Sequence, residues 1–210
     1  MIEVNASYQI LKLPSEEDLR LIELAARTCY KSEHKITQDS WKGLVSKLVE
    51  LGHESVLEHS LITVKFICDR GISHELVRHR LASYSQESTR YCNYSKDKFH
   101  NQITVIRPFY LTGEQYEIWK QCMLECERTY FKLLELGCKP EEARAVLPNS
   151  LKTEIVVSAN IREWRHILRL RTSRRAHPQM RELMIPLLQE LKAKVSVVFD
   201  DIIPDGEVQL

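Results

Sequence analysis

Glycine is scarce in this sequence of 210 residues: there are only six, and no two of them lie close together. The share is less than half of the roughly 7% found in an average protein. A glycine-rich loop that cradles phosphate needs two or three glycines within a few residues. The sequence therefore excludes a Walker loop and a dinucleotide-binding fingerprint, and any nucleotide phosphate must be held by other groups.

Long apolar runs and paired cysteines are also absent. There is no stretch of about 18 apolar residues, and the first residues lack the basic and apolar regions of a signal peptide. None of the six cysteines stands in a Cys-x-x-Cys pair, which argues against a zinc ribbon or a thioredoxin-type site. We therefore expect a cytoplasmic protein with reduced thiols and no membrane partner. Cys122 and Cys126, four residues apart, are expected to be small buried side chains of one helix.

The rest of the composition is that of a globular chain, with 43% hydrophobic residues, 28% charged residues and a formal net charge of +1. This balance argues against disorder and allows a domain with a sizeable core. We expect an α+β fold in a single domain, 1–210, in which an antiparallel sheet is flanked by long helices.

Residue periodicity and capping residues predict the elements of this fold. Helices open at proline or at a capping residue, such as the hydroxyl cap at Ser15 and the capping box over Thr112-Gly-Glu-Gln115. The strands are rich in β-branched side chains. Strands are expected at 2–12, 61–68, 102–106 and 153–158. Helices are expected at 15–30, 37–51, 73–80 and 112–136, from 140, from 160 and at 178–199, where Pro186 is able to introduce a kink. Residues 53–59 and 83–96 are expected to be loops.

Arginine is concentrated in two segments, 70–90 and 160–181, although the whole chain is nearly neutral. The planar guanidinium binds phosphate through two hydrogen bonds and stacks on rings. Arg78-His79-Arg80 places three cationic side chains in a row on an expected short helix, an arrangement that favours a nearby anion. The alternative is a solvated charged turn.

The helix expected from Asn160 carries an apolar stripe, and Arg171 projects toward this stripe between Trp164 and Ile167. An arginine on an apolar face needs a partner. That partner is either a carboxylate inside the protein or a bound anion.

Histidines are a further candidate for chemistry. His53 and His59 flank a glutamate-containing segment, and His74 and His79 follow. Their spacings do not match a helical pair of zinc ligands, and no cysteine stands at ligand spacing. We therefore expect no metal.

Several of these segments together resemble one enzyme family. Arg78-His79-Arg80, followed by Ser88 and Arg90, is similar to the R-H-R-x7-S-x-R signature of the flavin-dependent thymidylate synthases. Segments 53–59, 143–148 and 160–171 resemble the other blocks of this family, in the same order. Ser85 and Gln86 stand where the family often has Asn and Glu.

The resemblance implies a methyltransferase of nucleotide biosynthesis that converts dUMP to dTMP. It implies FAD as the cofactor of a flavoprotein, 5,10-methylenetetrahydrofolate as the folate carbon donor, and NADPH as the reductant. It also implies a homotetramer whose four active sites lie at subunit interfaces. None of the cysteines stands in the Pro-Cys-His setting of the classical thymidylate synthases, so no cysteine nucleophile is expected.

By position in the matching blocks, the resemblance also implies site residues. FAD is expected at Ser55, Arg78, His79, Arg80, Gln86, Asn160, Arg162 and His166. The substrate dUMP is expected at Glu75, Leu76, Val77, Arg78, Gln86, Glu87, Ser88, Thr89, Arg90, Arg144 and Arg171. Arg171 is the expected catalytic cation beside the uracil ring, and His53 is expected to position groups or handle a proton.

Two other classes of function fit the arginine clusters. An Arg-rich single-stranded nucleic-acid-binding module would use residues 160–175 and 83–95 to follow a phosphate backbone. A structural interaction protein would pair these arginines with the acidic C-terminal helix across an oligomer interface. The net charge of +1 argues against the first, because such modules are usually strongly basic, and we expect no nucleic-acid partner.

Overall fold

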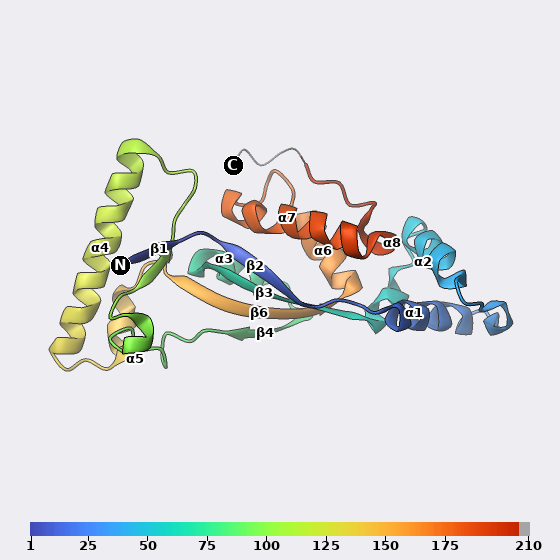
Figure 1. Ribbon diagram of the computed structural model, residues 1–210, viewed down its shortest axis with the longest axis horizontal. Coiled ribbons are helices and arrows are strands. Elements are labelled where there is room, and N and C mark those ends of the chain that lie inside the picture. The colour runs from blue at the N-terminus through green and yellow to red at the C-terminus, as the bar shows by residue number, and fades with distance from the viewer. Residues whose placement is uncertain (206–210) are drawn as a thin grey trace. The chain divides into compact units, whose positions relative to one another are not determined.

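The computed structural model describes residues 1–205, so residues 206–210 of the expected single domain lie outside the described part. Helices and strands are mixed along the whole chain, as expected (Figure 1). The chain divides into two compact units. Unit 1 consists of Met1–Ser7, Phe66–Arg78 and Ser85–Val156, and unit 2 of Tyr8–Lys65, His79–Tyr84 and Val157–Leu210.

The larger sheet is antiparallel and has four strands in the order β2-β3-β6-β4. Their bounds are Ser7–Lys12 for β2, Leu61–Asp69 for β3, Lys152–Asn160 for β6 and Ala82–Gln86 for β4. Burial alternates along β3 and β6, so one face of each strand packs into the core. The strands expected at 61–68 and 153–158 are confirmed.

Strand β4 corrects the expectation of a loop over 83–96. Half-buried Tyr84 alternates with exposed Ser83 and Ser85, which is the period of a strand. The polar composition concealed this alternation. The segment 53–59 was also expected to be a loop, but it forms a short 3-10 helix, η2, over Glu54–His59.

Unit 1 contains a second, parallel sheet that the sequence did not predict. Strand β1 (Ile2–Val4) pairs with β5 (Thr104–Ile106), with Ile2 opposite Thr104. The stretch 2–12, expected as one strand, therefore forms two, β1 and β2. The core of this unit includes the side chains of Tyr94, Ile103, Val105, Met123, Tyr130, Ala143 and Leu151.

The helices of unit 1 are α3 (Arg70–Leu76), α4 (Gly113–Glu135) and α5 (Pro140–Ala143), with 3-10 segments η3 (Asp97–Phe99) and η4 (Arg144–Val146). Met123 and Tyr130 face the core from α4. Cys122 is exposed and Cys126 half-buried, so the expectation that both are buried was wrong, because they stand beside this core-facing stripe. No helix in the described part of the chain is both long and apolar enough to cross a membrane.

Helix α3 starts and ends earlier than the expected helix over 73–80. The side chain of Asp69 caps it by accepting a hydrogen bond of 2.7 Å from the backbone nitrogen of Ile72. Val77 is its C-cap. Arg78, His79 and Arg80 therefore follow the helix instead of lying on it, which corrects the expectation for this motif.

Unit 2 is mainly helical. It contains α1 (Glu16–Thr28), α2 (Ser40–Glu50), α6 (Ile161–Arg171), α7 (Pro178–Lys194) and α8 (Ser196–Phe199), with a 3-10 segment η1 (Glu33–Lys35). Helix α1 packs against α2 and η2, and α6 packs against α7 and η2. The helix expected at 178–199 is interrupted at Val195, whose φ of −141° and ψ of 52° are not helical.

The hydroxyl cap expected at Ser15 and the capping box expected at Thr112 have different outcomes. At the start of α1, Ser15 and Asp18 each bond the backbone nitrogen of the other. At the start of α4, Thr112 makes no side-chain cap hydrogen bond within the described chain, so the box expected there was wrong.

This difference is testable with two matched alanine substitutions. Ser15→Ala removes a cap that is formed, so we expect a loss of about 1 kcal/mol in the free energy of unfolding. Thr112→Ala, the control, should cost clearly less. Urea unfolding followed by circular dichroism at one protein concentration measures both, and equal losses would contradict the assignment of the caps.

Candidate functional site

Helix α6 carries Arg162, His166 and Arg171 of the side chains expected to do chemistry in unit 2, and three hydrogen bonds fix its start. The side-chain oxygen of Asn160 accepts from the backbone nitrogen of Glu163 at 2.8 Å, as its capping role predicts. The backbone nitrogen of Ile161 donates to the carbonyl of Ser60 at 3.0 Å. The buried indole of Trp164 donates to the carbonyl of Ile62 at 2.9 Å. These bonds hold α6 against the end of η2 and the start of β3.

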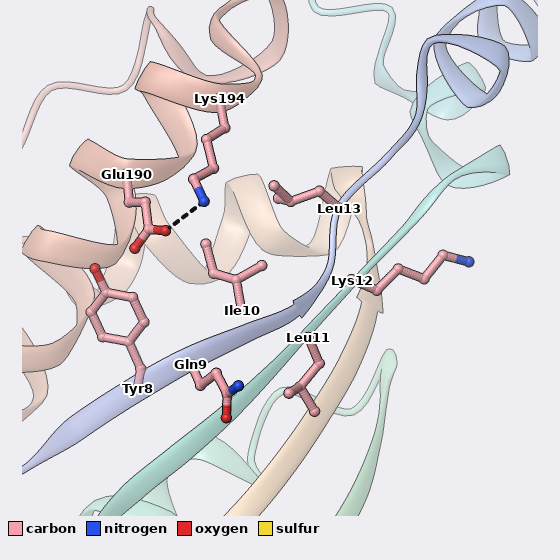
Figure 2. Close-up of a pocket in the computed structure, with 8 residues that line it drawn as sticks. All are labelled: Tyr8, Gln9, Ile10, Leu11, Lys12, Leu13, Glu190 and Lys194. Atoms are coloured by element: carbon pink, nitrogen blue, oxygen red, sulfur yellow. Dashed lines mark ion pairs between the residues drawn. The ribbon is translucent and has the colours of Figure 1, made fainter.

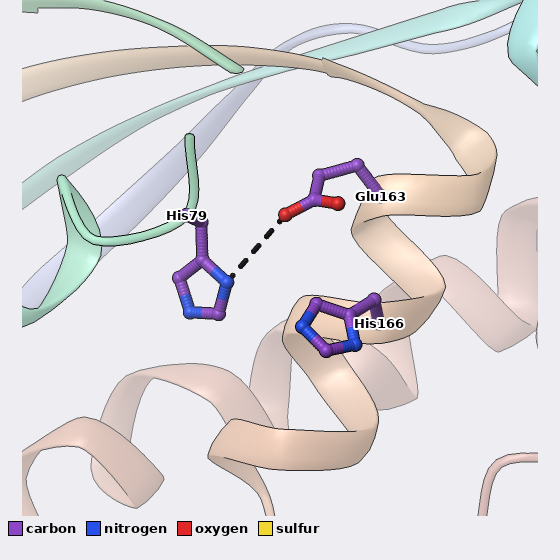
Figure 3. A group of neighbouring side chains, drawn as sticks. All are labelled: His79, Glu163 and His166. Atoms are coloured by element: carbon purple, nitrogen blue, oxygen red, sulfur yellow. Dashed lines mark ion pairs between the residues drawn. The ribbon is translucent and has the colours of Figure 1, made fainter. Parts of the chain in front are cut away.

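His79 is buried, with 5% of its surface exposed, and a polar side chain lies on each side of its ring. The Nε of Arg171 donates to its Nε2 at 2.9 Å, and Oε1 of the buried Glu163 lies 3.5 Å from its Nδ1. The hydroxyl of Tyr84 donates to the backbone carbonyl of His79 at 2.6 Å. Figure 3 shows the ring of His79 facing Glu163, with His166 on the same helix as Glu163.

Burial determines the protonation state of His79. It lowers the pKa of His79 from 6.5 to about 4, helped by the charges of Arg171 and His166. The imidazole is therefore neutral at pH 7, and because Nε2 accepts from Arg171, the ring proton sits on Nδ1, toward Glu163. Burial also raises the pKa of Tyr84 to about 12, so its hydroxyl remains a donor.

His79, Glu163 and His166 offer three possible metal-ligating atoms within 4.8 Å of one another. Two histidines and a carboxylate form a donor set that binds zinc or iron in other proteins. Here, however, Nε2 of His79 already accepts from Arg171, and the guanidinium would repel a second cation. The arrangement disfavours a metal, and the absence of one stays a prediction.

Arg171 lies half-buried at the end of α6, as the helical pattern predicted. One hydrogen bond of Arg171 goes to a neutral imidazole, and the expected carboxylate or bound anion beside it stays a prediction. A neutral acceptor orients the guanidinium without cancelling its charge. Two segments far apart in the sequence, the motif at 78–80 and the end of α6, thus meet in one contact.

His53 and Ser55 line a hollow of about 380 Å³ in unit 2, together with Glu54 and Arg162. The other walls come from the end of α1 and from α2. Arg162 is exposed and bonds Glu58 at 2.6 Å. Three side chains expected at the catalytic or flavin site, His53, Ser55 and Arg162, are therefore brought together, whereas Asn160 serves as the cap of α6.

A separate hollow of about 410 Å³ in unit 2 lies along β2 and contains none of the expected site residues (Figure 2). Burial and a hydrogen bond with Glu190 raise the pKa of Tyr8 in its wall to about 12. Glu190 also pairs with Lys194 at 3.0 Å. Nothing in this hollow joins it to the chemistry described above.

The end of β4 and the loop after it carry several of the residues of unit 1 that the resemblance assigns to the substrate. The side chain of Gln86 donates to Ser73 at 2.8 Å and to Thr153 at 3.2 Å. Arg144 donates to the hydroxyl of Thr89 at 3.4 Å. Exposed Arg90 bonds Glu141 of α5 at 2.9 Å, so α5 and η4 lie beside the loop.

The remaining expected residues differ in how far they can reach a ligand. Glu87 pairs with Lys152 at 3.0 Å, and Ser88 accepts from the backbone nitrogen of Arg90. Arg78, Arg80 and Val77 are exposed and Glu75 is half-buried, but the side chain of Leu76 is packed in the core. Any contact of Leu76 with a ligand would thus have to use its backbone.

The sequence reasoning missed several residues of this region: Glu54, Tyr84, Glu163, Arg165 and Asp201. Arg165 is completely buried. A signal for it was present, because it stands four residues after Ile161 and three before Leu168, on the edge of the apolar stripe. Its carboxylate partners lie far away in the sequence and carried no such signal.

Comparison with known proteins identifies a matching family and relatives of this chain. Residues 11–196 match the family model described as thymidylate synthase complementing protein. A flavin-dependent thymidylate synthase of Geobacter sulfurreducens is 36% identical over 187 residues, covering 86% of this chain and 80% of the relative. One of Pyrococcus abyssi is 36% identical over 162 residues, covering 77% of this chain and 66% of the relative.

A solved structure also resembles the chain. Thymidylate synthase X from Helicobacter pylori, crystallised with FAD and dUMP, aligns with a TM-score of 0.74 at 24% identity. The alignment covers 94% of this chain and 98% of the other. At this identity the likeness establishes a shared fold.

The depressed pKa of His79 predicts a pH dependence of stability. The unfolded chain takes up a proton at this histidine near pH 6.5, whereas the folded chain does so only near pH 4. Acidification between these values therefore favours the unfolded state. We expect His79→Gln to lose less stability from pH 7 to pH 5 than the unaltered protein.

Urea unfolding at several pH values measures the slope of the free energy of unfolding against pH. The exposed His34 supplies the control, since His34→Gln should leave the slope as it is. A His79→Gln variant with the same slope as the unaltered protein would show that His79 is not held neutral.

Proposed function

Because this chain belongs to the flavin-dependent thymidylate synthase family, we propose that it converts dUMP to dTMP by reductive methylation with FAD as its cofactor. The carbon donor is 5,10-methylenetetrahydrofolate and the reductant is NADPH. The observation that carries the proposal is the contact between His79 of the Arg-His-Arg motif and Arg171 at the end of α6. It joins a neutral imidazole to a half-buried guanidinium.

The residues of unit 2 fit a flavin nucleotide chemically. The hollow beside His53 and Ser55 combines apolar walls with a hydroxyl and the guanidinium of Arg162. Apolar walls suit a ring system, and the arginine with the hydroxyl suits phosphate oxygens. Ser55, His79, Arg80, Asn160, Arg162 and His166 are the proposed flavin contacts in unit 2, and Arg78 and Gln86 those in unit 1. FAD, when bound, supplies the redox chemistry.

Unit 1 supplies the proposed phosphate site for dUMP. Arg90 and Arg144 present guanidinium groups beside Thr89 and the loop after β4. These groups take the place of a glycine-rich loop, which this sequence lacks. The other proposed substrate contacts are Glu75, Leu76, Val77, Arg78, Gln86, Glu87 and Ser88.

Arg171 is the proposed catalytic cation. Negative charge on the uracil ring makes its carbon more reactive, and a preorganised guanidinium stabilises that charge. His79 orients Arg171 without neutralising it, because its imidazole is uncharged at pH 7. His53 lines the hollow of unit 2 as an exposed side chain, and we assign it a positioning or proton-handling role.

The proposal includes an assembly and a location. The enzyme is a homotetramer with active sites at subunit interfaces, located in the cytoplasm, and it forms no covalent bond to uracil through cysteine. The nucleic-acid-binding alternative is not favoured, because both the family model and the relatives named above are thymidylate synthases.

The reaction itself can be tested by tritium release from dUMP labelled at C5 of the uracil ring. We expect release that requires FAD, NADPH and methylenetetrahydrofolate together, and a flavin absorption that bleaches with NADPH. Folded, flavin-containing protein that releases no tritium would contradict the proposal. Colourless protein that binds oligonucleotides with a steep salt dependence would support the alternative.

The role of Arg171 predicts the effect of Arg171→Ala. We expect turnover to fall on the order of 10²-fold or more, because a preorganised charge is removed, while FAD remains bound. The control is Arg128→Ala on the exposed face of α4. Near-normal turnover of a folded Arg171→Ala protein would reject the assigned role.

A further inference from the structure

Arg165 is the centre of an ion-pair network that the site described above does not use. None of its surface is exposed, and its Nε donates to Oε1 of Glu54 at 2.9 Å. Its two terminal nitrogens donate to the two carboxylate oxygens of Asp201, each at 2.7 Å, and one also bonds the carbonyl of Val198. Arg169, one turn further along α6, bonds the same two carboxylates at 3.0 Å each.

The two carboxylates belong to different parts of unit 2. Asp201 lies in the segment after α8, whereas Glu54 is the first residue of η2 and stands between His53 and Ser55. All three consecutive residues line the same hollow. The network therefore ties α6 to the short segment that carries two of the proposed functional side chains.

Two backbone hydrogen bonds hold the start of this segment. The backbone nitrogen of His53 donates to the carbonyl of Leu48, and that of Glu54 to Gly52. Gly52 itself adopts a positive φ of 71°, which allows the sharp turn out of α2. The charge-assisted bonds from the side chain of Glu54 to Arg165 and Arg169 are the strong anchor among these contacts.

The charges of the network strengthen the bonds between Glu54 and the two arginines. Burial alone would raise the pKa of Glu54, but hydrogen bonds and charges of Arg165 and Arg169 lower it, and the same holds for Asp201. Both carboxylates are therefore ionised at pH 7. A completely buried guanidinium cannot move without losing these partners, so it sets where Glu54 lies.

From this geometry we infer that Arg165 is a positioning residue: through Glu54 it fixes His53 and Ser55 in the hollow proposed to hold the flavin. The inference rests on the proposed function for what the hollow binds, but its structural core concerns only residues 53–55. If the network only stabilised the fold, loss of the charge of Glu54 and loss of the charge of Asp201 would affect residues 53–55 to the same extent.

The different positions of Glu54 and Asp201 provide the test. Replacing Arg165 would leave two carboxylates without their main partner and endanger folding, so its partners are changed instead. Glu54→Gln and Asp201→Asn each remove one charge without changing side-chain size. Both variants should lower the midpoint temperature of thermal unfolding. In Glu54→Gln alone, we expect backbone amides at 53–55 to exchange hydrogen at least about tenfold faster.

The same two variants are compared for FAD, using flavin fluorescence for the dissociation constant and tritium release for turnover. Glu54→Gln should weaken FAD binding at least about tenfold, and Asp201→Asn less than about threefold. Equal effects of both variants on exchange at 53–55, or no effect of either, would overturn the inference. Unaltered protein that neither binds FAD nor releases tritium would refute the proposed function, and the exchange measurement would still decide the positioning role.

Discussion

Burying arginine is the constraint on which the organisation of unit 2 depends. A guanidinium taken out of water is costly unless its charge is paired or its donors are satisfied. Helix α6 carries two such side chains, the fully buried Arg165 and the half-buried Arg171. Arg165 is bonded to carboxylates, and Arg171 is bonded to a neutral imidazole.

Two carboxylates match the charge of Arg165, whereas Arg171 donates a hydrogen bond to a neutral imidazole. A neutralised arginine contributes orientation and packing, but little electrostatic potential toward a ligand. An arginine held by a neutral acceptor keeps its potential and is fixed in direction. Such a group is suited to stabilising negative charge that develops during a reaction.

The parts of the fold that sequence reasoning predicted well are those with strong local patterns. Strands β3 and β6 alternate between buried and half-buried residues, and Ser15 has its capping partner three residues away. The errors arose where tertiary contacts decided the outcome. Asp69 started α3 early by capping it, and the orientation of α4 left Cys122 exposed.

The residues of the candidate site also differ in whether a local sequence pattern could reveal them. Arg171 could be singled out because helical spacing placed it on the apolar side of α6, and the blocks at 78–90 and 160–171 carried the resemblance. Glu54 and Asp201 could not, since a carboxylate that lies 111 residues before Arg165, or 36 after it, leaves no trace in local spacing. The protonation of His79 likewise depends on burial, which only the folded chain reveals.

The central claim is that His79 is a neutral acceptor that orients Arg171. Nitrogen NMR of the protein labelled in its histidine rings tests it most directly, with His79→Gln used to assign the signals. We expect Nδ1 of His79 to carry the proton at pH 7 and Nε2 to carry none, and we expect this state to persist to about pH 5. Two protonated ring nitrogens at pH 7 would contradict it, because an imidazolium cannot accept a hydrogen bond from Arg171.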